Sequence, residues 1–470
     1  MKKTKIIATI GPASSDKEIL RKMINNGMDI ARINMAYSNY EFCTDIINKI
    51  NELNKEMNKF VSIMLDLEGP DIKVLKFKTG SAYLNKGSKI NIYTDGRLGD
   101  EYGFSVNYPK FVKEIRLGTR IKINDGLIDL VVIDKTENYL ICEVMIGGFI
   151  ENNKSINIIG KKIDIPFLSD KDYNDIIYAD KMNVDFLALS FVSNSEDVLK
   201  VNDKLIELGN DNISIISKIE NEKAVEEIDE IINVSDGVIV ARGDLGVEIP
   251  LERVPGIQKM IISKCHRLGK VSIVATEMMA TMQNNARPTR AEVNDVASSV
   301  LDSVDCVMLS GETTIGRYPV EAVGLMSKII EATEEDVNYF ELLDASMRTE
   351  KQDVTGSIAY SVVDCSNRLR CNAIVTATMS GYTARKLSRF RSKSVIIAMS
   401  PDIKVVKNLN LYYGIYPVLI NECNSFDSIM NKSKEIAKNI LKDEFGRIII
   451  TGGYPFNKVK HTNFMKIEEL

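Results

Sequence analysis

Charged residues stand at the end of a strand that is otherwise built for a protein core. Lys218 and Glu220 follow the apolar run formed by Ile213, Ile215 and Ile216. An unpaired ammonium or carboxylate inside a protein costs several kcal/mol, so both groups need a partner, solvent or a ligand.

Four further strand-like segments end in residues that can bind a metal ion or a phosphate. These are Arg32 and Asn34, Asp66 and Glu68, Arg242 and Asp244, and Thr276 and Glu277. Glu220 and Asp244 could supply oxygen ligands for Mg²⁺ or Mn²⁺, because such ions bind few carboxylates and leave room for substrate oxygens. Lys218 and Arg32 offer positive charge to a phosphate or a developing oxyanion. The set indicates phosphoryl or enolate chemistry.

The segment Ala-Arg-Gly-Asp-Leu-Gly places a glycine on each side of Asp244. If a short helix begins there, the backbone N–H groups of Gly243 and Asp244 can hold an anion such as a carboxylate. Each of these features also has a purely structural explanation. A single charged residue at a strand end usually forms a surface salt bridge. The Ala-Arg-Gly-Asp-Leu-Gly segment could be a tight turn, and Thr276 could cap a helix. Five strand ends with ligand-type residues favour the functional interpretation.

The elements that must hold these residues are eight apolar strand-length runs, each followed by a helical pattern. They are Lys5–Ile10, Asp29–Ile33, Val61–Leu67, Val184–Ser190, Ile213–Lys218, Gly237–Ala241, Val271–Thr276 and Cys306–Leu309. Continuous apolar strands that alternate with helices predict a parallel sheet covered on both faces. Eight such units fit an α/β fold of the (β/α)8 TIM barrel type, whose sites form at the carboxyl ends of the strands.

Two further parts complete the predicted architecture. Between the third and fourth strands, alternating segments and an Asn-Asp-Gly turn predict a small inserted all-β domain at residues 72–162. The barrel then comprises residues 1–71 and 163–340. A second series of strands, AIVTATM, VIIAMS, YPVLI and RIIITGG, predicts a C-terminal α/β domain at residues 341–470.

The composition of the 470-residue chain argues against several classes of protein. With a net charge of −5 and no basic arm, nucleic acid is not an expected partner. The apolar runs are strand-length, so no membrane span is expected. Seven cysteines stand singly, as is typical of reduced thiols in the cytoplasm. Because His266 and His461 are the only histidines, acid–base chemistry would rest on carboxylates, lysines or water.

Several longer segments have a distinctive sequence. They are KTKIIATIGPAS, GMDIARIN, SKIENEKAVEEIDEII, DGVIVARGDLGVEIP, VATEMMATM, ARPTRAEVNDVASSVLDSVDCVMLSGET, GRYPVEAV, SGYTARKLSRFR and LYYGIYPVLI. In this order, along essentially the whole chain, they resemble the signatures of the pyruvate kinase family. The resemblance implies transfer of the phosphoryl group of phosphoenolpyruvate to ADP, giving pyruvate and ATP. It also implies that the inserted domain is a lid, that the C-terminal domain serves effector binding and assembly, and that the chain forms a homotetramer.

The resemblance also implies roles for single residues. Lys218 would stabilise the phosphoryl group during its transfer, and Arg32 would contact it. Glu220 and Asp244 would hold Mg²⁺ or Mn²⁺ against the enolpyruvate oxygens. Lys154, on the lid, would contact the nucleotide.

The remaining implied roles concern the substrate carboxylate and the enolate. The backbone N–H groups of Gly243 and Asp244 would receive the carboxylate, and Thr276 would lie on the face where the enolate is protonated. The chemistry is then an in-line phosphoryl transfer that depends on positioning and charge neutralisation, followed by protonation of the enolate.

The chain departs from the family pattern where a monovalent cation would bind. Residues 32–37 read Arg-Ile-Asn-Met-Ala-Tyr, whereas the family usually has Arg-x-Asn-Phe-Ser-His. Ala36 replaces the serine that helps to bind the cation. Asn34, Asp66 and the Leu67 carbonyl remain as potential K⁺ ligands.

The segment LDLEGPDIKVL mixes the patterns of two subgroups of the family. Asp71 resembles the subgroup that requires K⁺, whereas Leu67 and Val74 resemble the subgroup that carries a lysine at the place of Asp71 and does without K⁺. Lys73 replaces an arginine that contacts nucleotide phosphate, and a lysine keeps the charge but loses the bidentate fork. We therefore expect weaker nucleotide binding and weakened or absent K⁺ activation, with Lys73 supplying part of the missing positive charge.

The resemblance places a phosphorylated effector in the C-terminal domain, with Thr378, Ser380 and Thr383 as candidate phosphate contacts. The last loop reads GYPFNKVKHTN, where the family often has a turn rich in glycine and serine. Because backbone cradling of a phosphate needs the freedom of glycine, this loop argues against control by fructose bisphosphate. Lys458 and Lys460 could bind another phosphate, although exposed lysines are more often only solvated.

Three hypotheses of function follow from these observations. The favoured one is a working pyruvate kinase, because Lys218, Glu220, Asp244 and Thr276 are all present. A lyase acting on pyruvate or oxaloacetate would use the same metal and enolate but would need neither a lid nor Lys154. A degenerate paralogue with a regulatory or assembly role would explain the unusual residues at positions 36, 37, 71 and 73, and it would be expected to lose the strand-end residues as well.

Overall fold

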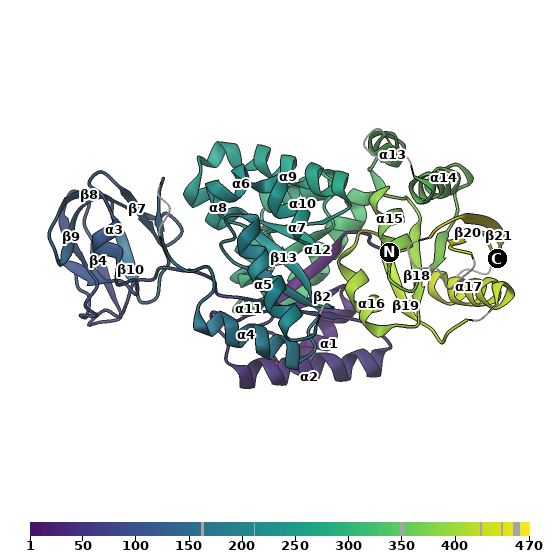
Figure 1. Cartoon of the computed structure of the whole chain (residues 1–470), viewed down its shortest axis with the longest axis horizontal. Helices are drawn as coiled ribbons and strands as arrows, with labels where there is room; N and C mark the ends of the chain where they lie inside the picture. The colour runs from purple at the N-terminus through teal and green to yellow at the C-terminus, as the bar shows by residue number, and fades with distance from the viewer. Residues whose placement is uncertain (161–163, 211, 348–352, 424, 443–444, 455–460) are drawn as a thin grey trace.

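The computed structural model describes residues 1–160, 164–210, 212–347, 353–423, 425–442, 445–454 and 461–470. Figure 1 shows three parts along the long axis: a β-rich part at one end, a barrel with its helices in the middle, and a C-terminal α/β part at the other end. The predicted fold class, a TIM barrel with an inserted all-β domain and a C-terminal α/β domain, is confirmed.

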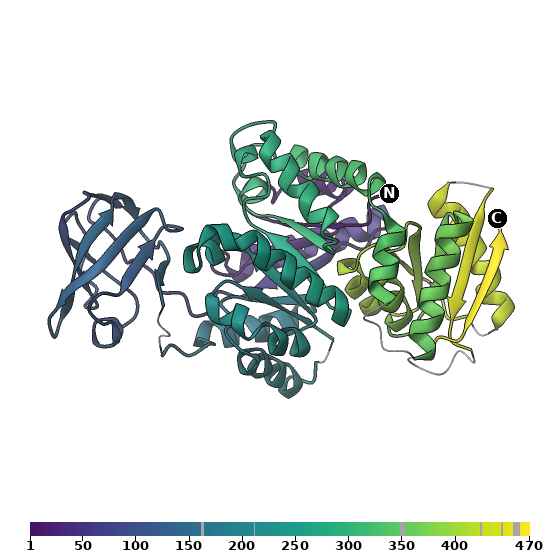
Figure 2. The same ribbon diagram turned by 90° about the horizontal axis from the view of Figure 1, so that it is seen from above.

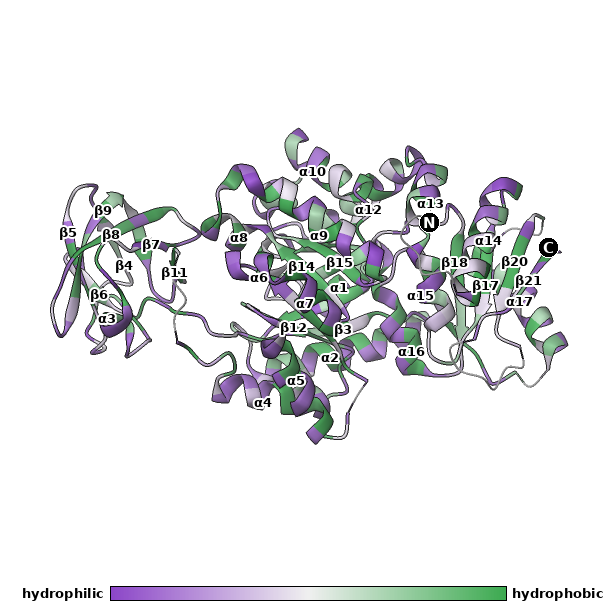
Figure 3. Ribbon diagram, turned by 45° about the horizontal axis from the view of Figure 1, so that its top comes forward, coloured by the Kyte–Doolittle hydropathy of each residue, from purple (hydrophilic) through white to green (hydrophobic). Residues whose placement is uncertain are grey.

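Eight parallel strands close into the barrel in the order β1-β16-β15-β14-β13-β12-β3-β2. They are β1 (Lys5–Thr9), β2 (Ile30–Asn34), β3 (Ser62–Asp66), β12 (Phe186–Leu189), β13 (Ser214–Ile219), β14 (Gly237–Ala241), β15 (Val271–Ala275) and β16 (Cys306–Leu309). Each overlaps one of the eight predicted runs. Figure 3 shows hydrophobic residues concentrated on these strands, because helices cover their outer face and side chains fill the interior.

The outer layer of the barrel consists of helices that follow the strands in sequence. They are α1 (Lys17–Asn25), α2 (Tyr40–Met57), α4 (Asp170–Lys181), α5 (Ser195–Glu207), α6 (Glu222–Glu226), α7 (Ile228–Val234), α8 (Arg242–Glu248), α9 (Val254–Leu268), α10 (Arg290–Leu301), α11 (Gly311–Thr314) and α12 (Pro319–Glu335), with the 3₁₀ turns η1 (Leu251–Arg253) and η2 (Ala280–Gln283). The capping box of Thr289 and Glu292 starts α10, and Pro319 occupies the first turn of α12.

The inserted part has a core of its own between β3 and β12 of the chain. Its elements are β4 (Ser81–Leu84), β5 (Lys89–Tyr93), β6 (Gly103–Ser105), α3 (Phe111–Glu114), β7 (Arg120–Ile123), β8 (Ile128–Lys135), β9 (Tyr139–Ile146), β10 (Gly148–Glu151) and β11 (Ile156–Ile158). They form a six-stranded sheet, β11-β7-β8-β9-β5-β6, and the pair β10-β4. The turn between β7 and β8 has left-handed φ values of 55° at Asn124 and 54° at Asp125, which suit a tight hairpin.

The exact domain boundaries stay predictions. The boundary between residues 162 and 163 lies outside the described residues. We refer to residues 72–160 as the lid.

The C-terminal part is a five-stranded sheet flanked by helices, as Figure 2 shows from above. It contains α13 (Tyr339–Met347), α14 (Val354–Leu369), β17 (Ala373–Ala377), α15 (Tyr382–Arg389), β18 (Val395–Ser400), α16 (Ile403–Asn408), η3 (Leu409–Leu411), β19 (Ile415–Leu419), α17 (Phe426–Leu441), β20 (Arg447–Gly452) and β21 (Phe464–Glu469). The antiparallel edge strand β21 was not predicted, because its short sequence, FMKIEE, has three charged residues and no regular alternation of apolar and polar residues.

The C-terminal part also closes one end of the barrel. Leu411 packs into the cluster formed by Ile7, Ile30 and other interior residues of the barrel. This leaves the carboxyl ends of the barrel strands to face the lid. Among the helices of the described residues, none has the length and apolar character needed to cross a membrane.

Candidate active site at the carboxyl ends of the barrel strands

Side chains from neighbouring strand ends form a continuous chain of charge-assisted contacts. Arg32 Nε donates to Asp66 Oδ2 over 2.7 Å, and Asp66 Oδ1 lies 3.5 Å from Lys218 Nζ. Ser190 Oγ joins the last two residues, because it accepts from Lys218 Nζ over 2.9 Å and donates to Asp66 Oδ1 over 3.2 Å. Lys218 Nζ also lies 2.9 Å from Glu220 Oε1. The structure therefore brings together residues predicted from three separate strand ends.

Burial makes the charges of this chain depend on one another. Asp66 and Glu220 are each only 1% exposed, and Arg32 is 6% exposed. Burial alone would lower the pKa of Lys218, but the negative charges of Asp66 and Glu220 outweigh it and raise that pKa above its ordinary value. Burial alone would raise the pKa of Asp66, yet Lys218 and Arg32 hold it below its ordinary value. Lys218 and Asp66 are therefore both ionised at neutral pH.

Asp244 differs from the other charged residues because its carboxylate has no hydrogen-bond or ion-pair partner among the described residues. Burial and then the charge of Glu220 raise the pKa of Asp244 to about 7. Glu220, in contrast, accepts the Phe191 N–H over 2.7 Å in addition to its contact with Lys218. Two carboxylates that repel each other, one of them without a counter-charge, fit a divalent cation.

The protein offers few ligands for such a metal ion. In the described part of the chain there is no group of three or more His, Cys, Asp or Glu side chains that could hold a metal ion. A cation between Glu220 and Asp244 would therefore take its other ligands from substrate oxygens or water, which suits Mg²⁺.

The predicted short helix after β14 is present as α8. Arg242 ties its start to the barrel, with Nη1 2.6 Å from Asp295 Oδ1 and Nη2 donating to the Thr276 carbonyl over 2.7 Å. The Gly243 N–H donates to Thr276 Oγ1 over 2.8 Å. Thr276 has a φ of 68°, which is rare for a β-branched residue and occurs most often where the surroundings hold a functional group in place. Its hydroxyl contacts the amino end of α8 through Gly243, the residue before Asp244.

Comparison with known proteins assigns this arrangement to a family. The profile described as pyruvate kinase, barrel domain, matches residues 1–323, and the profile described as pyruvate kinase, alpha/beta domain, matches residues 356–468. The chain belongs to the pyruvate kinase family. The pyruvate kinase of Staphylococcus saprophyticus subsp. saprophyticus is 41% identical over 470 residues, which cover 99% of this chain and 80% of that protein. A pyruvate kinase of Staphylococcus aureus is 39% identical over the same shares of the two chains.

Membership of the pyruvate kinase family makes the chain a phosphotransferase and confirms the resemblance seen in the sequence. It does not test the roles predicted for single residues, which stay predictions.

The predicted K⁺ ligands of the family are occupied by internal hydrogen bonds. Asn34 Oδ1 accepts the Ala36 N–H over 2.9 Å. The single hydroxyl hydrogen of Ser190 is shared between the Leu67 carbonyl, 2.7 Å from Oγ, and Asp66 Oδ1, 3.2 Å away. A cation at this place would have to compete for each of these oxygens without help from a side-chain oxygen at position 36.

Lys73 lies in a cluster of charges beside the same strand ends. Its Nζ donates to Glu68 and lies 3.5 Å from Asp71 Oδ2. Burial alone would lower the pKa of Lys73, but the hydrogen bond to Glu68 and the charge of Asp71 raise it. Lys171 Nζ, 3.4 Å from the other Glu68 oxygen, adds a second positive charge. The carboxylates of Glu68 and Asp71 thus lie on either side of the Lys73 ammonium. The sequence predicts that this ammonium binds nucleotide phosphate or replaces part of the K⁺ charge.

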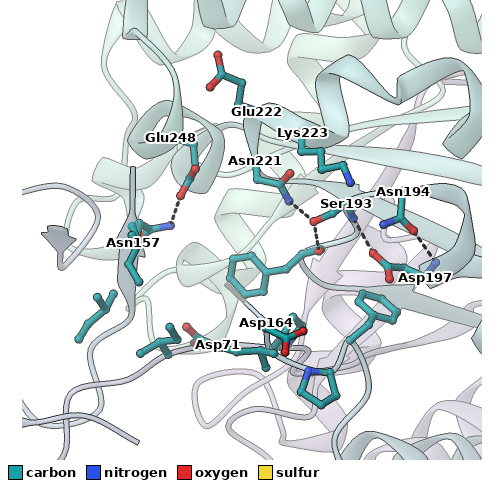
Figure 4. A pocket seen from close by; sticks show the side chains of 18 of the residues that line it. Asp71, Asn157, Asp164, Ser193, Asn194, Asp197, Asn221, Glu222, Lys223 and Glu248 are labelled. Atoms are coloured by element: carbon teal, nitrogen blue, oxygen red, sulfur yellow. Dashed lines mark hydrogen bonds between the residues drawn. The ribbon is translucent and has the colours of Figure 1, made fainter. Parts of the chain in front are cut away.

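A cleft of about 670 Å³ separates the lid from the rim of the barrel, as Figure 4 shows. Ile72 and Asn157 line it from the lid, whereas Asn221 and Glu222, directly after Glu220, line it from the barrel. Lys218 and Asp244 do not line this cleft, which therefore lies beside the charged chain and does not contain it. Lys154 is another lid residue, 3.3 Å from Glu151 and partly exposed.

The predicted effector contacts lie in the C-terminal part, far along the long axis from the lid (Figure 1). Thr383 is buried and its hydroxyl lies 2.8 Å from that of Thr462. Thr378 is also buried, and Ser380 is half-buried. Lys458 and Lys460 lie outside the described residues, so the predicted effector site stays a prediction.

Three residues of the site were not singled out from the sequence. Ser190 bridges Lys218 and Asp66, the Phe191 N–H binds Glu220, and Thr9 Oγ1 accepts Arg32 Nη1 over 2.7 Å. Ser190 and Thr9 each stand at or near the end of a predicted strand, so the rule that found the charged residues could have found these hydroxyls. Phe191, with its left-handed φ of 57°, gave no signal in the sequence.

Proposed function

We propose that this chain transfers the phosphoryl group of phosphoenolpyruvate to ADP, giving pyruvate and ATP. The observation that carries the proposal is the position of Lys218, whose ammonium lies between the carboxylates of Asp66 and Glu220 at the rim of the barrel. This ammonium is ionised and held in place before a substrate arrives, as stabilisation of a transferring phosphoryl group requires.

The positive side of the site receives the phosphoryl group. Lys218 and Arg32 neutralise the charge that spreads over its oxygens, and both are held by Asp66, so little reorganisation is needed during transfer. Lys73 and Lys154 are our candidates for contacts with the nucleotide phosphates. Lys73 would first have to leave Glu68 and Asp71, which supports the expectation of weaker nucleotide binding.

Glu220 and Asp244 would hold the divalent cation, Mg²⁺ or Mn²⁺. When bound there, the cation supplies charge neutralisation for the substrate oxygens. The unpartnered carboxylate of Asp244 and its raised pKa support this assignment. The Glu220 side chain is kept in position by the Phe191 N–H and by Lys218.

The amino end of α8 would receive the substrate carboxylate through the N–H groups of Gly243 and Asp244. The Gly243 N–H donates to Thr276 Oγ1, so a carboxylate at this place would have to replace that hydrogen bond and would then lie beside both residues. Thr276 would then lie beside the enolate, where it can orient the proton donor that completes pyruvate.

We further propose that K⁺ has little or no effect on turnover. The internal hydrogen bonds of Asn34 and Leu67 and the missing hydroxyl at Ala36 support this view. The surroundings of Lys73 give little support to the idea that its charge replaces K⁺, because Glu68 and Asp71 already balance it.

The other proposals follow from the family and from composition. Family membership supports a homotetramer and a phosphorylated effector at Thr378, Ser380 and Thr383 as hypotheses. All seven cysteines are free thiols, which supports a reducing, cytoplasmic location. Nothing in the comparisons favours the degenerate paralogue, and the chain of contacts from Arg32 to Glu220 is complete.

The test is formation of pyruvate from phosphoenolpyruvate and ADP by the purified chain in the presence of Mg²⁺. We expect turnover that depends on both substrates and stops when the metal is chelated. Folded protein without turnover at any concentration of Mg²⁺ or Mn²⁺ would support the degenerate paralogue instead.

A further inference from the structure

Two lid residues on paired strands both reach the carboxyl end of α8. Lys122 on β7 and Asn157 on β11 are direct partners in the antiparallel register of these strands. Lys122 Nζ donates to the Val247 carbonyl over 2.7 Å, and Asn157 Nδ2 donates to Glu248 Oε1 over 3.3 Å. Figure 4 shows the second contact at the edge of the cleft.

These contacts lie at the opposite end of α8 from its candidate site residues. Arg242 ties the amino end of the helix to the barrel through Asp295 and the Thr276 carbonyl. Asp244 follows in the first turn. The lid holds the other end, and at about 1.5 Å per residue only about 5 Å of helix separates Asp244 from Val247. The lid contact therefore lies within one helical turn of Asp244.

The chemistry of the contact suits the end of a helix. The last carbonyls of a helix have no intrahelical partner, and a cation placed there is favourable. A helix of seven residues is not stable by itself, so its position depends on what holds its two ends. The β7–β8 turn lies near the same residue, since a Cβ atom added to Gly126 would be in ordinary van der Waals contact with Val247, 3.7 Å from its Cγ2.

We propose that Lys122 and Asn157 form a clamp that couples the seating of the lid to the position of Asp244. Both are positioning residues, because they act on the candidate metal and carboxylate site only through α8. With the clamp made, Asp244 is held opposite Glu220. With the clamp open, the carboxyl end of α8 loses its hydrogen bonds to the lid. The proposal rests on the proposed function, since it assigns the clamp to the binding of the divalent cation and phosphoenolpyruvate.

The test compares Lys122→Met with the wild type, with Lys122→Arg as the conservative variant and Lys89→Met, an exposed lysine elsewhere on the lid, as the control. We expect Lys122→Met to lower kcat/KM for phosphoenolpyruvate about tenfold and to raise the Mg²⁺ concentration needed for half-maximal rate by a similar factor. Lys122→Arg should recover most of the loss, and Lys89→Met should show none. Asn157→Ala should act in the same direction, and the double variant should lose less than the product of the two single effects, because both residues hold one helix end.

Hydrogen–deuterium exchange gives a readout that does not depend on turnover. We expect Lys122→Met to speed exchange of the backbone amides of residues 243–248 while exchange in strands β8 and β9 stays as in the wild type. Faster exchange throughout the lid would show a role in lid folding and overturn the clamp. Wild-type rates and exchange in Lys122→Met would also overturn it. An inactive wild type would refute the proposed function, whereas the exchange experiment would still decide whether the lid holds α8.

Discussion

The ammonium of Lys218 lies 2.9 Å from the carboxylate of Glu220; the Lys218 side chain is 12% exposed and that of Glu220 only 1%. Lys218 faces Asp66 and Arg32 on its other side, whereas Glu220 faces Asp244, which has no counter-charge of its own. The rim of the barrel therefore carries positive charge on one side and excess negative charge on the other. A substrate that brings both a phosphate and a metal ion would complement the two sides at once.

Replacement of Lys218 by methionine should lower kcat by at least about 10²–10³-fold, because it removes a preorganised positive charge from the developing transition state. Lys218→Arg should lower kcat less, since it keeps the charge but changes its position. Steady-state rates with saturating phosphoenolpyruvate and ADP measure both. Lys259→Met serves as a control, because Lys259 is 71% exposed and pairs with Asp302 on the surface. A rise in KM alone, with kcat unchanged in Lys218→Met, would contradict the assigned role.

The barrel and the polar residues at its rim could be predicted from the sequence because both depend on local patterns. Each strand is a continuous apolar run, and the carboxyl ends of parallel strands meet at one rim whatever the details of packing. Lys218, Glu220 and Asp244 were therefore found by reading single positions. That argument needs no knowledge of distances between side chains.

The parts that could not be predicted depend on contacts between distant segments. No pattern in the sequence shows that Lys73 would pair with Glu68 and Asp71, or that Lys122 would reach Val247, 125 residues away. Ser190 could not be predicted as a site residue for a different reason: a serine at a strand end has many structural roles. Edge strand β21 gives no clear signal because three of its six residues are charged and, among the described strands, it pairs with β20 alone.

Asp244 should make the metal-free protein less stable at high pH. Its pKa in the folded protein, about 7, is above the ordinary value of 3.8. Between these two values the folded state binds more protons than the unfolded state, so stability falls as the pH rises toward 7 and the carboxylate ionises. In the presence of a chelator, Asp244→Asn should therefore melt several degrees above the wild type at pH 8, and the difference should vanish near pH 4.

Added Mg²⁺ should reverse that order at pH 8, because the ion stabilises the wild type by binding its folded state and cannot bind Asp244→Asn as tightly. Differential scanning calorimetry with and without metal measures both effects. Glu222→Gln, which changes an exposed carboxylate on the cleft, is the matched control and should behave as the wild type. Equal melting temperatures of Asp244→Asn and the wild type at pH 8, with and without Mg²⁺, would remove Asp244 from the metal site.

Turnover should change less than about twofold when K⁺ is replaced by tetramethylammonium at constant ionic strength, so that screening is unchanged. The reason is that Asn34 and Leu67 already have internal donors and Ala36 supplies no oxygen. Ala36→Ser should increase the response to K⁺, because it restores a side-chain ligand. Strong stimulation of the wild type by K⁺ would show that the ion displaces these internal hydrogen bonds.

Lys73→Arg should lower KM for ADP several-fold, because a guanidinium can bind phosphate through two parallel hydrogen bonds. KM for phosphoenolpyruvate should stay the same. Lys73→Met should raise KM for ADP, whereas Lys76→Met, an exposed neighbour, should have no effect. Initial rates with ADP varied at saturating phosphoenolpyruvate give these values. If Lys73→Met left KM for ADP unchanged, Lys73 would be a structural partner of Glu68 and Asp71 only.

His266 should make the protein sensitive to acid at the junction of the barrel and the C-terminal part. Burial, followed by the nearby charge of Arg391, lowers the pKa of His266 to about 4. An unfolded histidine binds its proton near pH 6.5, so between about pH 6.5 and 4 only the unfolded chain is protonated at this residue. The free energy of unfolding should therefore fall with decreasing pH, by at most about 1.4 kcal/mol per pH unit from this one group.

Urea titrations at pH 7 and pH 5 measure that loss, and comparison of variants separates His266 from the carboxylates that titrate at lower pH. His266→Gln removes the titrating group and should show a smaller loss of stability between the two pH values than the wild type, even if it is less stable at pH 7. His461→Gln should keep the wild-type difference, because His461 lies near the chain end beside Asn463 and away from this junction. The same pH dependence in His266→Gln and in the wild type would mean that the buried imidazole does not couple protonation to unfolding.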